Sequence, residues 1–349
     1  MNEFDFIEQL RAKAGDSNTP ELSLGIGDDA AIIKQFSGRD TLVTSDLLVE
    51  DIDFRRDSSP PHLLGHKALA VSLSDIAAMG GRPRWAVLSL GVPEDIWNSD
   101  FVTQFYEGLF GLARRYDVQL IGGDLSRTTG KIIIDSTVIG ECASGQAVLR
   151  KGAQVGDQLF VTGSLGGSAA ALRLLERGLH LKQNQMNDEA ESIEQLLLCH
   201  LRPEPRVGWG LVLGEEGLAS AMIDISDGLS SDIHHLCDES RVGALVESAR
   251  IPRNEHVTAL CGRRALDPLM LALHGGEDFE LLFTVRPGDV ARLPSRVDGV
   301  PISYVGDIVE ESGKIQIIEK DRIWNLEPGG FEHFKSCRTV SQEYKIAVN

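Results

Sequence analysis

Cysteine is scarce in this sequence, and its spacing limits the kinds of site that the chain can build. The 349 residues include five cysteines, far apart and without a CxxC pair: Cys142, Cys199, Cys237, Cys261 and Cys337. This pattern argues against a zinc site and favours a reducing compartment. We therefore expect buried free thiols in a protein of the cytoplasm.

Long apolar runs and basic stripes are also missing. No segment approaches the length that spans a membrane, and the acidic N-terminus lacks the basic and apolar regions of a signal peptide. Lys and Arg total 34 against 52 Asp and Glu, a formal charge of −18. We therefore expect neither membrane nor nucleic-acid partners. Since acid repels phosphate, phosphate chemistry here requires metal ions or local Arg, Lys and backbone N–H groups.

Three familiar catalytic motifs do not occur. The sequence has no GxxxxGK[ST], which excludes a P-loop, and no HExxH, which excludes a zinc protease of the HExxH type. It also has no GxSxG, which excludes the nucleophile elbow of α/β-hydrolases. The turn at 164–167, Ser-Leu-Gly-Gly, resembles a phosphate loop, but a lone glycine-rich turn is a weak signal.

Hydrophobic content of 42% and the chain length predict two domains with sizeable cores. We place the boundary near residue 150, which gives domains 1–149 and 150–349. Both mix helices and strands, so the fold class is α/β, a sandwich in outline. The predicted helices are 4–14, 63–79, 101–116, 169–177, most of 196–220, and 230–239. The predicted strands are 85–92, 118–121, 132–139, 157–163, 221–229, 244–246, 279–285, 302–309 and 314–318.

The acidic stretch 25–46 reads as two strands, 25–33 and 41–46, joined by a turn near 37–40. Antiparallel pairing would bring together the polar residues at the strand ends: Asp28, Asp29, Thr44, Ser45 and Asp46. Carboxylates at such short separations repel one another unless a cation lies between them, and oxygen ligands suit Mg²⁺. The alternative is a polar hairpin whose aspartates only form turns.

Acidic residues recur in one setting, at the end of an apolar strand beside glycine or a small hydroxyl residue. The clusters are Gly27-Asp28-Asp29, Thr44-Ser45-Asp46, Gly122-Gly123-Asp124, Asp224-Ile225-Ser226-Asp227-Gly228 and Gly276-Glu277-Asp278. Strand ends are where ligands gather in α/β folds. Together with Asp75 inside an apolar helix, the clusters predict a site that collects several divalent cations around a polyphosphate.

The ordered series of these motifs resembles the thiamine-monophosphate kinase family, within the aminoimidazole ribonucleotide synthetase-like superfamily. The resemblance runs from about residue 4 to about residue 334. The stretches that carry it are GIGDDA at 25–30, KALAVSLSDIAAMG at 67–80, QLIGGD at 119–124, IDISDGL at 223–229 and GGEDFEL at 275–281. Single pieces are unspecific, whereas the whole series is highly specific.

The resemblance implies a two-domain fold and a homodimer whose N-terminal sheets pair into a barrel. The N-terminal domain would bind ATP and Mg²⁺, and the C-terminal domain would complete the nucleotide and substrate site. The implied metal-site residues are Asp29, Thr44, Ser45, Asp46, Asp75, Asp124, Asp224 and Asp227. The implied ATP contacts are Gly123, Asp124, Arg150 and Ser226, and the catalytic group is Asp46, Asp124, Arg150 and Asp227. Thiamine monophosphate would contact Asp53, Glu277 and Phe331.

The implied reaction is direct in-line transfer of the ATP γ-phosphate to thiamine monophosphate, which gives thiamine diphosphate and ADP. Because the attacking phosphate oxygen is already anionic, the absence of an evident catalytic base is no objection. Phe331 stands where the family often has Tyr or Trp, and 326–330 departs from the expected pattern, which weakens the substrate assignments.

Several residues have simpler interpretations. Arg150 is otherwise an ordinary linker charge, Lys67 a side chain that snorkels from its helix, and Asp278 a cap within its turn. Two other function classes also remain open. One is another ATP-using enzyme of the superfamily, although a selenophosphate synthetase would need a reactive residue near the N-terminus and the first cysteine is Cys142. The other is a non-catalytic Mg-nucleotide-binding regulator, which would bind ATP and release no ADP.

Overall fold

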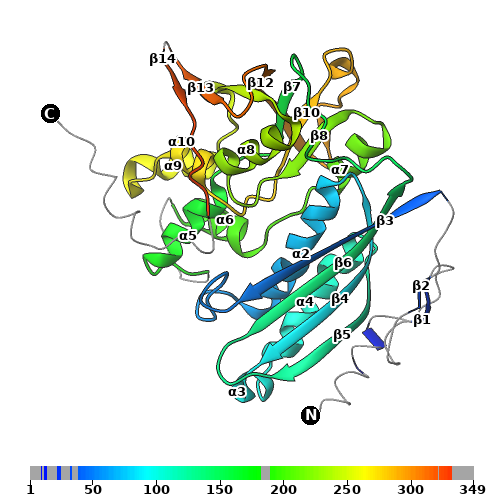
Figure 1. Cartoon of the computed structure of the whole chain (residues 1–349). Coiled ribbons are helices and arrows are strands. Elements are labelled where there is room, and N and C mark those ends of the chain that lie inside the picture. The colour runs from blue at the N-terminus through cyan, green and yellow to red at the C-terminus, as the bar shows by residue number, and fades with distance from the viewer. Residues whose placement is uncertain are drawn as a thin grey trace.

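A computed structural model describes residues 38–181, 189–320 and 322–331, together with 9, 12–13, 22–24 and 32–33. The described chain contains a smaller and a larger sheet, with helices packed on both (Figure 1). The smaller sheet has the order β3-β6-β4-β5. Its strands are β3 (Arg39–Val49), β4 (Arg82–Val92), β5 (Gln119–Arg127) and β6 (Ile133–Ala143). All its pairs are antiparallel except β4 with β5.

The larger sheet has the order β14-β13-β9-β12-β7-β10-β8, with β11 paired to β12. Its strands are β7 (Gln158–Thr162), β8 (Ala219–Asp224), β9 (Gly243–Glu247), β10 (Leu281–Val285), β11 (Arg296–Val297), β12 (Val300–Val309), β13 (Ile315–Glu319) and β14 (Arg322–Asn325). The mixture of helices and sheets confirms the predicted α/β class.

Helix α2 (Pro61–Ala78) lies between the two sheets and organises the molecule (Figure 1). A proline at its first turn supplies a backbone angle that already fits a helix. The other α-helices are α3 (Glu94–Trp97), α4 (Phe101–Arg115), α5 (Gly167–Glu176), α6 (Ala190–Leu201), α7 (Val207–Glu215), α8 (Leu229–Ser240), α9 (Glu255–Arg264) and α10 (Pro268–His274). Short 3₁₀ turns are η1 (Ser248–Arg250) and η2 (Val290–Arg292).

One hydrophobic core runs from the smaller sheet across α2 and into the larger sheet. It contains Leu69 and Leu73 of α2, Trp209 of α7 and Phe283 of β10, all essentially inaccessible to solvent. Because α2 is buried on almost every side, polar groups on it need partners inside the protein. This is why the serines and the lysine of α2 take part in the site described below.

The structure corrects the predicted pairing of the acidic hairpin. Strand β2 (Ile32–Ile33) pairs with β1 (Leu22–Leu24), and β3 pairs with β6 along its whole length. The physical reason is length, because a two-residue strand cannot satisfy the backbone groups of an eleven-residue strand. Asp28, Asp29 and most of the predicted helix 4–14 lie outside the described residues.

The idea that the acidic clusters end their strands is wrong for two of them. Residues 44–46 lie in the middle of β3, and 122–124 lie inside β5, whose glycines are tolerated because β5 is an edge strand of the described sheet. Among the clusters within the described ranges, Asp224 alone is the last residue of a strand, β8. Alternation along β3 also separates Ser45 from Thr44 and Asp46, which face the opposite side.

Two smaller predictions concern thiols and membranes. The four described cysteines are free thiols, but only Cys142 and Cys237 are buried as predicted, whereas Cys199 and Cys261 are partly exposed. Cys337 lies outside the described residues. No helix in the described ranges is both long and apolar enough to cross a bilayer. The domain boundary near residue 150 stays a prediction.

Candidate active site

Three carboxylates from three different elements gather between the sheets: Asp46 of β3, Asp75 of α2 and Asp224 of β8. Burial, followed by the charge of Asp75, raises the pKa of Asp46 to about 6. Burial raises the pKa of Asp224 to about 7, again with Asp75 and then Asp46 contributing. Burial also raises the pKa of Asp75. These three carboxylates influence one another electrostatically and are named here the acidic centre.

Hydroxyl groups hold each carboxylate of the acidic centre in place. Ser72 Oγ donates to Asp46 Oδ2 at 2.6 Å, and Ser74 Oγ donates to Asp224 Oδ2 at 2.8 Å. Thr44 Oγ1 donates to Asp75 Oδ2. Sequence reasoning noted Thr44 only as a ligand and gave the two serines no role, although small hydroxyl residues in a buried helix are a usable signal of polar partners.

Arg150 is the positive charge beside the acidic centre. Its guanidinium acts against burial and lowers the pKa of both Asp75 and Asp224, so it lies within electrostatic reach of both. Its side chain is exposed, and its backbone carbonyl accepts a hydrogen bond from Ser240 Oγ at 3.0 Å. Arg150 therefore influences two of the predicted metal residues electrostatically.

The loop after β8 is fixed by a carboxylate that sequence reasoning missed. Asp232, in the first turn of α8, accepts hydrogen bonds from the backbone N–H groups of Asp227 at 3.2 Å and Gly228 at 3.0 Å. Burial, then the charges of Asp224 and Asp227, raises its pKa to about 8. The sequence signal for this role was an acidic residue in the first turn of the helix after Gly228, because acidic residues there often accept hydrogen bonds from the free N–H groups at a helix start.

A cavity of about 870 Å³ adjoins the acidic centre and is lined from both halves of the chain. It is lined by six of the predicted site residues: Asp46, Asp53, Ser226, Asp227, Glu277 and Phe331. Phe331 is 54% exposed, and its backbone N–H donates to the carbonyl of Asp227 at 3.2 Å. The backbone of Phe331, whose side chain is predicted to contact substrate, is thus hydrogen-bonded to the loop that contains the predicted metal residue Asp227.

Glu277 is anchored from behind by two side chains. Its carboxylate lies 2.7 Å from Lys67 Nζ of α2 and 3.1 Å from His200 Nδ1 of α6. Burial opposes ionisation, but Lys67 and His200 outweigh it and lower the pKa of Glu277. Burial and Lys67 lower the pKa of His200, which favours the neutral ring. Lys67 is 2% exposed, so the snorkelling interpretation is wrong.

Asp278 serves the protein backbone. Its carboxylate accepts from the N–H groups of Gly166 at 2.6 Å and Ser168 at 3.1 Å, at the start of α5. The capping interpretation is therefore right, but the capped turn belongs to a different segment, more than a hundred residues away in sequence. Burial raises the pKa of Asp278 to about 7 despite these bonds.

Asp124 and Ser45 are not brought to the acidic centre of their own chain. In the register of the sheet, Asp46 pairs with Ser136 of β6, and Ser136 pairs with Leu88 of β4. Leu88 in turn pairs with Gly123 of β5. Three steps of about 4.8 Å separate Asp46 from Gly123 by roughly 14 Å. Ser45 Oγ donates instead to Asp135 Oδ1 at 3.0 Å on the outer face of the sheet. Asp29 lies outside the described residues.

Comparison with known proteins identifies the family. The models of the AIR synthase related protein N-terminal and C-terminal domains match residues 27–142 and 154–318. Thiamine-monophosphate kinase of Bacillus subtilis (strain 168) is 36% identical over 338 residues, which cover 96% of this chain and 100% of that protein.

Solved structures agree with the sequence comparison. Thiamine-monophosphate kinase from Stenotrophomonas maltophilia K279a matches with a TM-score of 0.80 and 36% identity, over 91% of this chain and 96% of that one. A structure of AaThiL complexed with AMPPCP and TMP matches with a TM-score of 0.72 and 30% identity, over 93% and 96%. The chain described here therefore belongs to the AIR synthase related family and, within it, to the thiamine-monophosphate kinases.

Proposed function

We propose that this chain is an ATP-dependent kinase that converts thiamine monophosphate and ATP to thiamine diphosphate and ADP. Membership of the family supports the reaction, and the related AaThiL binds AMPPCP and TMP. The observation that carries the proposal is the meeting of Asp46, Asp75 and Asp224 beside a cavity of about 870 Å³. That cavity falls within the usual range for small-molecule and cofactor sites.

We further propose that Mg²⁺ binds at the acidic centre. Within the described ranges no group of three or more His, Cys, Asp or Glu side chains forms a ready-made metal cage. Mg²⁺ needs no such cage, because it commonly binds one or two carboxylates plus substrate phosphates and water. The donor set fits, since the oxygens of Asp46, Asp75 and Asp224 are hard ligands whose mutual repulsion a cation would relieve. Asp227 would complete the set from the cavity wall.

When bound, Mg²⁺ would neutralise phosphate charge and orient the γ-phosphate. Arg150 would add a fork of donors to phosphate oxygens, and Ser226 would line the nucleotide side. Asp53 and Glu277 would face the cationic thiazolium of the acceptor, and Phe331 would stack against one of its rings. Since the acceptor phosphate is already anionic, the chain only has to hold both phosphates in line and exclude water.

A direct assay tests this reaction. Purified protein supplied with ATP and thiamine monophosphate is expected to form thiamine diphosphate and ADP with Mg²⁺, and to lose this activity in excess EDTA. Stereochemical inversion at a chiral γ-phosphorus is the expected mark of a single in-line step. Retention would require a phospho-enzyme, and ATP binding without any ADP release would favour a regulator.

We also propose that the chain acts as a homodimer in the cytoplasm, with the outer faces of two smaller sheets together. The support is an outer face that exposes apolar side chains, with Val43 66% and Leu47 57% accessible. A second copy is also the partner that Gly123 and Asp124, remote from their own acidic centre, could serve. Light scattering is expected to give twice the mass of the 38.0 kDa chain, and Leu47→Glu to lower that mass. A wild-type monomer at micromolar concentration would contradict the proposal.

A further inference from the structure

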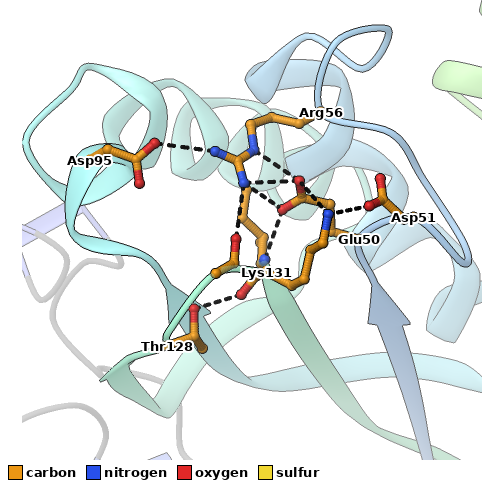
Figure 2. Close-up of polar contacts among 8 residues, drawn as sticks. Glu50, Asp51, Arg56, Asp95, Thr128 and Lys131 are labelled. Carbon is orange, nitrogen blue, oxygen red and sulfur yellow. Dashed lines mark hydrogen bonds and ion pairs between the residues drawn. The ribbon is translucent and has the colours of Figure 1, made fainter.

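A cluster of charged side chains around Glu50 and Arg56 has no role in the chemistry above (Figure 2). Its centre is Glu50, which follows β3 and is only 5% exposed. Arg56 donates to both carboxylate oxygens of Glu50, from Nε and Nη2, each at 3.0 Å. The backbone N–H of Ile132 donates to the same carboxylate at 2.9 Å. The bidentate contact of Arg56 with Glu50 is named here the Arg56 clamp. Bidentate pairing is the strongest way in which arginine binds a carboxylate.

The Arg56 clamp ties one loop to two other segments. Arg56 Nη1 lies 3.2 Å from Asp95 of α3, and Arg56 Nη2 donates to the carbonyl of Gly130 at 3.2 Å. Lys131 forms an ion pair with Asp51 and lies 3.9 Å from Glu50 (Figure 2). The loop 51–59 is therefore fastened at its start and at its middle to the turn between β5 and β6.

The opposite side of this loop is the cavity wall. Every residue of 51–59 lines the cavity except Arg56, which instead reaches the Glu50 carboxylate. The loop includes Asp53, whose Oδ2 accepts from the backbone N–H of Val49 at 2.8 Å. The loop thus lines the cavity with its other residues, while Arg56 binds Glu50.

The backbone of the loop also needs external support. Asp51 has a φ of 72°, in the left-handed region that most residues other than glycine disfavour and that aspartate enters only occasionally. Its N–H donates to the carbonyl of Phe54 at 2.7 Å, and its carboxylate pairs with Lys131. A disfavoured conformation persists only where the surroundings determine it, and such conformations concentrate at functional sites.

We infer that Arg56 is a positioning residue for the acceptor substrate: it holds loop 51–59 in the shape that binds thiamine monophosphate, without contacting it. The inference rests on the proposed function. If the Arg56 fork is lost, Glu50 keeps its charge and the Ile132 N–H but loses its bidentate partner, and the loop populates other shapes. The apparent affinity for the acceptor then falls in proportion to the fraction of molecules that keep the competent shape. ATP affinity is spared, because none of the implied ATP contacts, Gly123, Asp124, Arg150 and Ser226, lies in loop 51–59.

Kinetics of Arg56→Met and Arg56→Lys test the inference. For Arg56→Met we expect the KM for thiamine monophosphate to rise about tenfold, as when one molecule in ten keeps the competent loop. The KM for ATP should change less than about twofold, and Arg56→Lys, which keeps the charge but not the fork, should fall between. The matched control is Arg39→Met, because the ion pair of Arg39 with Glu141, at 3.0 Å, joins β3 and β6 at their other end. The control should match the wild type in both constants.

Hydrogen exchange of the peptide covering 51–59 provides a readout that does not depend on activity. Exchange there should accelerate in Arg56→Met and not in Arg39→Met. Unchanged exchange, an unchanged KM for the acceptor, or equal rises in both KM values with a lower melting temperature would each overturn the inference. A wild-type protein that makes no thiamine diphosphate would refute the proposed function instead, and the exchange result would still decide whether Arg56 holds the loop.

Discussion

Replacing Asp46 by asparagine is expected to lower thiamine diphosphate formation at least about 100-fold in a protein that remains folded. Asparagine preserves the shape of the side chain and can still accept the 2.6 Å hydrogen bond from Ser72. It removes the negative charge that, with Asp75 and Asp224, makes the acidic centre a site for cations. Steady-state rates at saturating ATP and Mg²⁺ measure the effect.

The same substitution should not weaken the metal-free fold. Burial, followed by the charge of Asp75, raises the pKa of Asp46, which means that an ionised Asp46 costs the folded state free energy. We therefore expect the melting temperature in EDTA to stay the same or rise, a pattern typical of functional residues whose charge opposes stability. Asp40→Asn is the matched control on the same strand, because Asp40 binds Ser144 and Gly145 away from the cavity.

The two readouts separate the possible outcomes. If Asp46→Asn loses the rate of thiamine diphosphate formation but keeps the wild-type melting temperature, both the kinase reaction and the role of the acidic centre are supported. A wild-type rate in Asp46→Asn would keep the family assignment but remove Asp46 from the mechanism. A lower melting temperature in EDTA would contradict the repulsion between the carboxylates.

Local sequence patterns predicted the elements that carry the site, but not how the strands pair. The apolar periodicity around Asp75 predicted a helix at 63–79, and the structure has α2 there. The partner of β3 could not be read in the same way, because β6 follows about ninety residues later and either face of a strand can be buried. Asp124 shows the consequence, since its glycine neighbours suggested a strand end although they lie inside β5.

Two helices of the larger half were missed although their start signals are present. The side chain of Asn254 accepts from the N–H groups at the start of α9, and Asp267, followed by a proline, does the same for α10. Helix α9 is mostly polar, and α10 is a short apolar run without polar residues in between, so neither shows the periodicity that predicts a helix. The Lys67 contact with Glu277 lay beyond any local signal, because it joins residues 210 positions apart (277 − 67) through the packing of α2 against the other half.

That contact supports a second prediction of large effect. Lys67→Met should lower the free energy of unfolding by about 3 kcal/mol, because it leaves the Glu277 carboxylate without its nearest cation. This figure is the lower end of the range for breaking a buried ion pair, since the Glu277 side chain is 31% exposed while that of Lys67 is 3% exposed. His200 is a weaker substitute, because burial, the largest effect on its ring, still lowers the pKa of His200 after Lys67 is removed. Urea unfolding followed by circular dichroism measures the loss.

An exposed ion pair provides the control for this prediction. Lys314 pairs with Glu311 three residues earlier, and both side chains are largely accessible. Lys314→Met should therefore change the free energy of unfolding by less than about 1 kcal/mol. Equal losses in Lys67→Met and Lys314→Met would contradict the view that burial makes the Lys67 contact strong.

The double variant Lys67→Met/Glu277→Gln distinguishes stability from substrate recognition. Each single change leaves one charge without its partner, so restoring neutrality should recover most of the lost stability, with a coupling free energy of about 2 kcal/mol. The KM for thiamine monophosphate should nevertheless stay high, because the carboxylate that faces the cationic thiazolium is gone. A double variant that recovers both stability and a wild-type KM would show that Glu277 serves only the ion pair. The acceptor site would then rely on Asp53 and the loop that Arg56 holds.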